Sequence, residues 1–168
     1  SIQDRDPRVI TEALKALGNI AHNGDIGKLS INKAVERITP LLGHQDRYVR
    51  LYASRALCWI SSKGSPTELV TAGTLRYLVP LLGDDEPDTR RYSLAILGEL
   101  VDLNMTDVIS NVDGIGPIGG LVVNRDTYTS HLAIKLLGKM GEQGFSPQIV
   151  SSGSSRMLFL ATSMADIK

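Results

Sequence analysis

A period of forty residues runs through the chain without a gap. Its leucine column contains Leu17, Leu57, Leu97 and Leu137. Each block opens with an acidic residue, at Asp6, Asp46, Glu86 and Asp126, and closes with a small or turn-forming residue, at Gly24, Gly64, Asn104 and Gly144. A period of this length predicts an array of stacked helical units in place of one central core.

The acidic residues that open the blocks predict the starts of four long helices. A carboxylate caps the first free amides and interacts favourably with the helix dipole, and proline suits the first helical position, as at Pro7 and Pro87. In the first block the apolar residues recur at helical spacing at Val9, Ala13, Ala16, Leu17 and Ile20. We expect helices of about four turns that bury these faces between neighbours, with Gly18, Gly98 and Gly138 allowing close helix contact.

A second motif lies between the long helices. Residues 38–43 and 78–83 are nearly identical, and they lie forty positions apart. Short apolar stretches and then turn-like positions at Gly73, Asp113 and Gly153 precede the later copies. Each unit is therefore predicted to contain a short helix, a turn, a second helix and a long third helix.

These features resemble the armadillo-repeat family. The similarity rests on the period, on the turns Ala72–Gly73 and Ser152–Gly153, and on the long-helix segment 13–21, and it covers nearly the whole chain. It implies an all-α, right-handed armadillo-type superhelix. The single array 1–168 would comprise a partial repeat 1–24, the repeats 25–64, 65–104 and 105–144, and a partial repeat 145–168. HEAT repeats are close relatives, and residues 46–50 are HEAT-like.

The resemblance also implies a concave face lined by the third helices. Five of the eight aromatic residues fall on this one predicted stripe, and Arg and Lys lie between them. Amphipathic rings beside cations are typical of binding hot spots. The candidate partner-binding residues are Tyr48, Tyr52, Arg55, Trp59, Asp88, Tyr92, Glu99, Tyr128, Lys135 and Lys139. The alternative is that the rings pack between adjacent helices with only their polar tips in water.

Nuclear-import adaptors of this family hold basic peptides with a Trp and an Asn in each repeat. The Trp positions here carry Lys15, Arg55, Ala95 and Lys135, and the Asn positions carry Asn19, Trp59, Glu99 and Lys139. Only Asn19 matches, and the cations would repel a basic signal. The expected partner is instead an extended peptide of another protein, with apolar or aromatic anchors and some acidic residues.

Composition disfavours several other classes of protein. The 18 Lys and Arg balance the 18 Asp and Glu, which argues against nucleic-acid binding by bulk charge. One cysteine and three scattered histidines predict neither a disulfide scaffold nor a metal site. The G-x-G-x-x-G spelling at 114–119 falls in a predicted second helix and does not indicate a nucleotide site. We expect no cofactor, no catalytic residue, no membrane insertion and a cytoplasmic or nuclear location.

Two alternatives remain open from the sequence. Trp59, Arg55, Tyr92 and Asp88 could be arranged as in HEAT-like DNA glycosylases. The chain opens with a long helix and its apolar segment 157–161 has no third helix to cover it. It could therefore be a self-associating scaffold segment of a longer array, or its uncapped ends could form a homo-oligomer.

Overall fold

The computed structural model describes residues 6–23, 28–63, 66–71 and 73–165, and these residues form helices joined by short turns, with no strand among them. The long helices are α1 (Pro7–Asn23), α3 (Arg47–Lys63), α6 (Pro87–Asp102) and α9 (Thr127–Met140). Between them lie α2 (Lys28–Ile38), η2 (Thr39–Gly43), α4 (Thr67–Thr71), α5 (Leu75–Leu81), α7 (Thr106–Ser110), α8 (Ile115–Gly120) and η3 (Leu121–Val123). The π-helical turn η4 (Gly141–Phe145), α10 (Ser146–Ser151) and α11 (Ser154–Ala165) follow α9.

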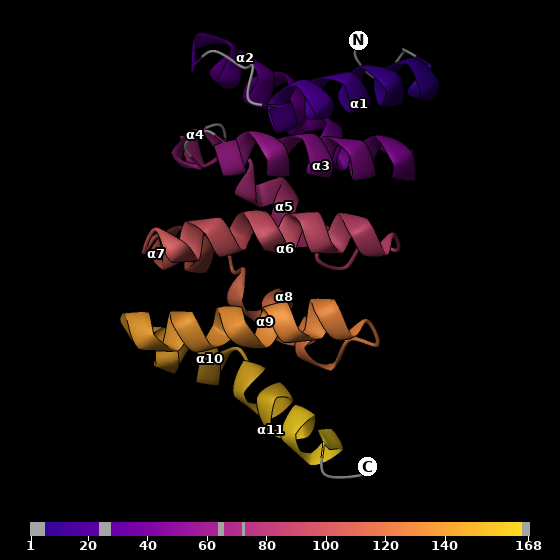
Figure 1. The fold of residues 1–168 in the computed structure, drawn as a ribbon. Helices are drawn as coiled ribbons and strands as arrows, with labels where there is room; N and C mark the ends of the chain where they lie inside the picture. Colours follow the sequence, from indigo (N-terminus) through magenta and orange to yellow (C-terminus); the bar gives the residue numbers. More distant parts are fainter. Residues whose placement is uncertain (1–5, 24–27, 64–65, 72, 166–168) are drawn as a thin grey trace. The chain divides into compact units, whose positions relative to one another are not determined.

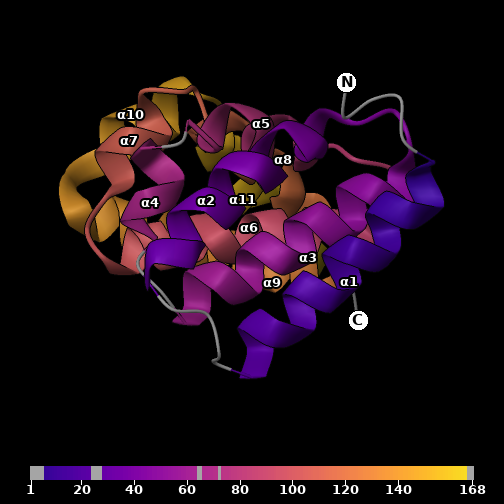
Figure 2. The ribbon, with the colours of Figure 1, turned by 90° about the horizontal axis from the view of Figure 1, so that it is seen from above.

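The chain divides into two compact units, residues 1–96 and 97–168, and the division falls inside α6. In the first unit α1 lies directly beside α3 (Figure 1), while α2 and α4 form a second layer (Figure 2). In the second unit α8 and η3 pack on α9, and α11 packs on α8. The single array 1–168 and its repeat boundaries stay a prediction.

Three of the four predicted caps are present. The Asp46 carboxylate accepts hydrogen bonds from the backbone amides of Tyr48 (2.8 Å) and Val49 (3.1 Å). Asp126 accepts a hydrogen bond from the backbone amide of Thr129, and Asp6 accepts one from the backbone amide of Arg8. Glu86 departs from the pattern because its carboxylate accepts a hydrogen bond from the Arg47 guanidinium instead. Side-chain capping therefore explains where three of the long helices begin.

The predicted helix ends and turns adopt the left-handed conformation. Asn104 has a φ of 58° and Gly144 has a φ of 91°. The turns before the second helices have φ values of 69° at Gly73, 55° at Asp113 and 78° at Gly153. Gly24 and Gly64 lie outside the described residues.

Exchanging the residues at two equivalent helix ends tests this interpretation. Asn104→Gly should raise the free energy of unfolding by about 0.5 kcal/mol, because glycine adopts a positive φ without a Cβ clash and this gain exceeds its entropy cost. Gly144→Asn should lower that free energy by a similar amount. Urea unfolding followed by circular dichroism measures both, and equal signs for the two exchanges would contradict the assignment.

The first unit departs from the predicted short-helix, turn and second-helix order. Helix α2 runs without interruption through Asn32 and Lys33, the positions at which the other units turn. Lys33 stands in the column of Gly73, Asp113 and Gly153, so this unit lacks a residue suited to positive φ. The prediction of a separate short helix in repeat 25–64 is therefore wrong within the described residues.

The apolar face predicted for the first long helix is also exposed, contrary to expectation. Val9 is 61% exposed, Leu17 36% and Ile20 46%, and Ala13 and Ala16 are exposed as well. Helix α1 buries its other side, including Ile10 and Leu14, against the rest of the first unit. The physical reason is that no described residue covers the predicted face of α1.

Close helix contact is confirmed at two of the three helix glycines. A Cβ at Gly18 would lie 3.6 Å from the Ala56 Cα, and one at Gly98 would lie 3.3 Å from the Leu136 Cδ1. A Cβ at Gly138 would meet no described atom within 4 Å. Cys58 in the same column is half-buried.

Candidate functional site

The predicted site residues lie outside the hydrophobic core. Tyr48 (54% exposed), Tyr128 (63% exposed) and Lys135 are exposed, and the other seven are half-buried. Six of them belong to the first compact unit: Tyr48, Tyr52, Arg55, Trp59, Asp88 and Tyr92. Glu99, Tyr128, Lys135 and Lys139 belong to the second unit. The structure thus brings the first six together in one unit, on α3 and the first turns of α6.

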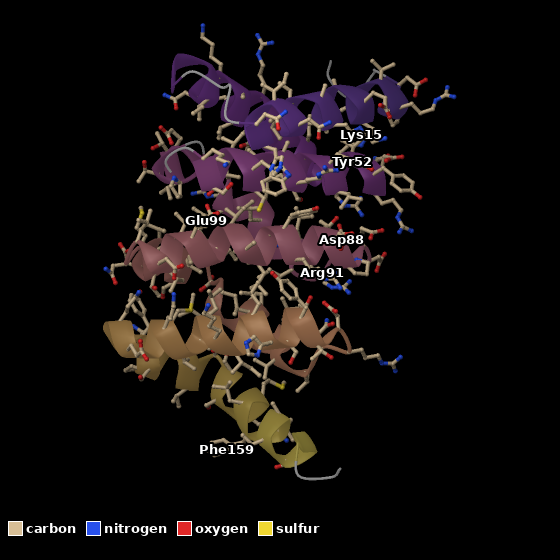
Figure 3. The ribbon with its side chains drawn as sticks, in the orientation of Figure 1. Lys15, Tyr52, Asp88, Arg91, Glu99 and Phe159 are labelled. Carbon is tan, nitrogen blue, oxygen red and sulfur yellow. The ribbon has the colours of Figure 1, made fainter. Side chains whose placement is uncertain are left out.

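Two cations flank the ring of Tyr52. The Lys15 Nζ lies 4.8 Å from the ring centroid, and the Arg55 Cζ lies 5.9 Å from it. Lys15 reaches across from α1, beside the Tyr52 ring of α3 (Figure 3). It also donates to Glu12 at 2.7 Å, and this hydrogen bond raises the pKa of the Lys15 ammonium. The negative π face of this ring attracts both cations, so positive charge is concentrated beside Tyr52.

Arg55 forms no ion pair with any residue in the described part of the chain. Arg55 is a half-buried residue, and its guanidinium lies beside the Tyr52 ring and interacts electrostatically with Tyr92. Burial raises the pKa of the Tyr92 phenol, and the positive charge of Arg55 opposes that rise. A half-buried arginine without a carboxylate partner is suited to receive one, because its planar donors fit a carboxylate in bidentate geometry.

The Trp59 ring on α3 packs against the neighbouring long helix, α1. Its ring centroid lies 4.2 Å from that of His22 on α1, with an angle of 62° between the ring planes. Trp59 packs partly against the core of the first unit, and its indole Nε1 is buried without a hydrogen-bond partner among the described residues. The ring therefore has a structural role, as the packing alternative expected, and it also carries an unused donor.

A hollow of about 300 Å³ continues from Tyr52 toward the starts of α1 and α3. Its lining comprises Pro7, Arg8, Thr11, Glu12, Lys15, Asp46, Tyr48 and Tyr52. The Arg47 guanidinium lies 5.4 Å from the Tyr48 ring centroid, so this second ring is also beside a cation. We call Lys15, Tyr48, Tyr52, Arg55, Trp59 and Tyr92 together the aromatic surface.

Several predicted charges are already paired within the chain. Asp88 accepts a hydrogen bond from Arg91 at 2.8 Å, one turn further along α6. Lys139 pairs with Asp102 in the second unit. Sequence reasoning missed Arg91, His22 and Arg47 as neighbours of the site. The i,i+3 spacing could have identified the Asp88–Arg91 pair, whereas the other two contacts had no signal in the sequence.

The described residues contain no group of three His, Cys, Asp or Glu side chains that could hold a metal ion. No described helix has the length and apolar character that a membrane span requires. The G-x-G-x-x-G segment forms α8, as predicted, and its Gly119 packs so closely on Ser154 of α11 that a Cβ would overlap that side chain.

A sequence model of HEAT repeats matches residues 1–97, more than half of the chain. The chain belongs to the HEAT-repeat family. No curated protein matches this HEAT-repeat chain. Its solved structural neighbours include designed armadillo proteins, which agrees with the armadillo resemblance of the sequence and confirms the all-α repeat fold.

One similar structure is an engineered protein from a structural genomics consortium, 24% identical, with a TM-score of 0.76 over 92% of this chain and 66% of that one. A second is a computationally designed armadillo repeat protein for modular peptide recognition, 20% identical, with a TM-score of 0.76 over 89% and 66% of the two chains. A third is a designed armadillo repeat protein in complex with the peptide (KR)4, 21% identical, with a TM-score of 0.72 over 95% and 77%. The HEAT-repeat chain thus spans about two thirds of the length of the first two.

Proposed function

We propose that this chain is a non-enzymatic protein-interaction module that binds an extended peptide of a partner protein along its long helices. The observation that carries the proposal is Arg55, a half-buried cation that lies beside the Tyr52 ring and has no counter-ion among the described residues. Designed armadillo proteins with this fold recognise peptides, which supports the class of partner.

The chemistry of the aromatic surface selects the kind of peptide. A carboxylate of the partner would pair with Arg55 and lie near Lys15, and an apolar or aromatic neighbour would pack on Tyr52 or in the adjoining hollow. The unused Trp59 Nε1 can donate to a peptide carbonyl once a small movement of the ring exposes it. The proposed segment therefore combines acidic residues with apolar or aromatic anchors.

The four residues of the second unit stay candidates for the same function. Lys135 is exposed, Lys139 is paired with Asp102, and Tyr128 and Glu99 lie on the same helical columns as the first-unit residues. The single cysteine fits a reducing compartment, and we place the chain in the cytoplasm or nucleus. The glycosylase alternative is disfavoured because Asp88 is held by Arg91, and because the charges of the chain sum to zero.

Peptide titration tests the proposal directly. Trp59 is the only tryptophan, so its fluorescence reports on the aromatic surface alone. An eight-residue peptide of alternating Glu and Phe should change this fluorescence, whereas the basic peptide (KR)4 should not. Arg55→Ala should weaken the binding of the acidic peptide by about tenfold or more, because a hydrogen-bonded charge contact is lost.

The matched control is Arg76→Ala, an exposed arginine on α5 outside the aromatic surface, which should leave the affinity unchanged. The double variant Trp59→Ala and Tyr92→Ala, read by anisotropy of a labelled peptide, should lose binding while circular dichroism shows that it folds. Equal binding of the two peptides, or full affinity in the double variant, would refute the proposed function.

A further inference from the structure

The face that α1 leaves exposed is buried at every other long helix of the chain. In α3 the equivalent residues Val49, Leu57 and Ile60 are 0–3% exposed. The equivalent positions of α6 and α9 are buried too: Thr89, Ser93, Ile96, Leu97, Leu100, Thr129, Ala133, Leu136, Leu137 and Met140. We call the exposed residues of α1, namely Val9, Ala13, Ala16, Leu17 and Ile20, the leading face.

At α3 and α9, the residues equivalent to the leading face are covered by the helical segments that precede each long helix. In the first unit α2 and η2 pack on α3, and in the second unit α8 and η3 pack on α9. The preceding long helix contributes as well, since Gly18 of α1 lies against Ala56 of α3 and Gly98 of α6 lies against Leu136 of α9. To be covered in the same way, the leading face of α1 would need to pack against a long helix and a second helix.

The last long helix, α9, and the last second helix, α11, expose residues that are buried at the equivalent positions earlier in the chain. Ile134 of α9 is 38% exposed, whereas Leu14 and Leu94 in its column are 2% and 0% exposed. A Cβ at Gly138 would meet no described atom within 4 Å, unlike a Cβ at Gly18 or Gly98. On α11, Leu158 is half-buried where Leu78 and Ile118 are 0% exposed. Phe159 is 74% exposed and projects from α11 (Figure 3). We call Ile134, Gly138, Leu158 and Phe159 the trailing face.

The two exposed faces are complementary halves of one repeating junction. The forty-residue register aligns Ala16 with Ala56, and it aligns Gly138 with Gly18. A second copy of α1 placed after α11 would therefore put Ala16 against Gly138, as Ala56 lies against Gly18 within the chain. In the same register Leu17, Ile20 and Leu158 are equivalent to Leu57, Ile60 and Ile38, which are buried together in the core of the first unit.

We propose that copies of this chain associate head to tail, with the leading face of one copy packed on the trailing face of the next. The occupant of the leading face is a second copy, because α9 and α11 are the types of element, a long helix and a second helix, that cover this face inside the chain. Contact between two leading faces would lack a glycine to receive Ala16. A head-to-tail contact leaves one free face at each end, so the assembly grows with concentration or closes into a ring.

Analytical ultracentrifugation of two blocked variants tests this assembly. Leu17→Glu with Ile20→Glu blocks the leading face, and Ile134→Glu with Phe159→Glu blocks the trailing face. All four side chains are at least 36% exposed, so the fold should persist, as circular dichroism can verify. The unsubstituted protein should grow in mass as its concentration rises toward about 1 mM. Each variant alone should remain a monomer.

A one-to-one mixture of the two variants should form a species of two chains and nothing larger, because each variant keeps one intact face. Leu103→Glu, on a 51% exposed residue outside both faces, is the control and should assemble like the unsubstituted protein. A monomeric unsubstituted protein at every concentration would overturn the proposal. So would assembly of the trailing-face variant by itself, which would indicate contact between two leading faces. Neither pair of substitutions touches the aromatic surface, so peptide binding is tested independently.

Discussion

Leu57→Ala is expected to lower the free energy of unfolding by about 3 kcal/mol, whereas Leu17→Ala in the same repeat column should cost under about 1 kcal/mol. Leu57 is 0% exposed and leaves a cavity when it is truncated, but Leu17 is 36% exposed and loses contacts only on one side. Urea unfolding followed by circular dichroism measures both values. The protein should be dilute, so that association does not stabilise the folded state.

Two further substitutions in the column serve as controls. Leu97 and Leu137 are 0% and 1% exposed, so alanine at either position should behave as at Leu57. Equal costs at Leu17 and Leu57 in dilute protein would show that the leading face is covered within the monomer. That result would contradict both the exposed α1 and the proposed assembly.

Arg50→Ala is expected to lower the free energy of unfolding by about 3 kcal/mol, because it leaves the Asp84 carboxylate buried without its partner. The side chain of Asp84 is 4% exposed, and the Arg50 Nε lies 2.6 Å from its Oδ2. The same guanidinium donates to the carbonyls of His44 and Gln45, both at 2.9 Å, so the turn between η2 and α3 would also lose two hydrogen bonds. Urea unfolding measures the loss.

Arg47→Ala provides the matched control for Arg50→Ala. Arg47 pairs with Glu86, whose side chain is 15% exposed, but the Arg47 side chain is itself 54% exposed, and pairs open to water on one side contribute less than buried pairs. The loss at Arg47 should therefore be much smaller than at Arg50, and it should shrink further in high salt. If the double variant Arg50→Met with Asp84→Leu were as unstable as Arg50→Ala, the explanation through an unpaired buried charge would fail.

The columns of the sequence predicted the long helices, three of their caps and the left-handed turns. These features depend on residues close together in the chain, so local chemistry was sufficient to predict them. Burial of Val9, Leu17 and Ile20 was predicted wrongly, because periodicity identifies the side that faces a neighbour and does not show that a neighbour is present. The continuous α2 followed from Lys33, whose effect on the turn was visible only by comparison with Gly73 and Gly153.

The sequence predicted which residues to consider for the candidate site, but it did not predict the contacts between them. Column positions identified Tyr52, Arg55 and Tyr92, and the structure places them in one unit on α3 and α6. The i,i+3 spacing is compatible with the Asp88–Arg91 pair, but the sequence could not show that Arg55 on the neighbouring helix has no acidic partner in the described chain. Whether such a pair forms depends on side-chain directions around the helix, which spacing alone does not determine.

The unbroken register also limits how the length of such a chain can change. One residue inserted into a long helix rotates everything after it by about 100°, which would turn Leu57 or Leu97 away from the interior. Gain or loss of a whole block of forty residues instead leaves the interior-facing residues of every remaining helix facing the interior. Duplication of entire blocks is therefore the tolerated route to a longer or shorter protein, and small insertions belong in the loops.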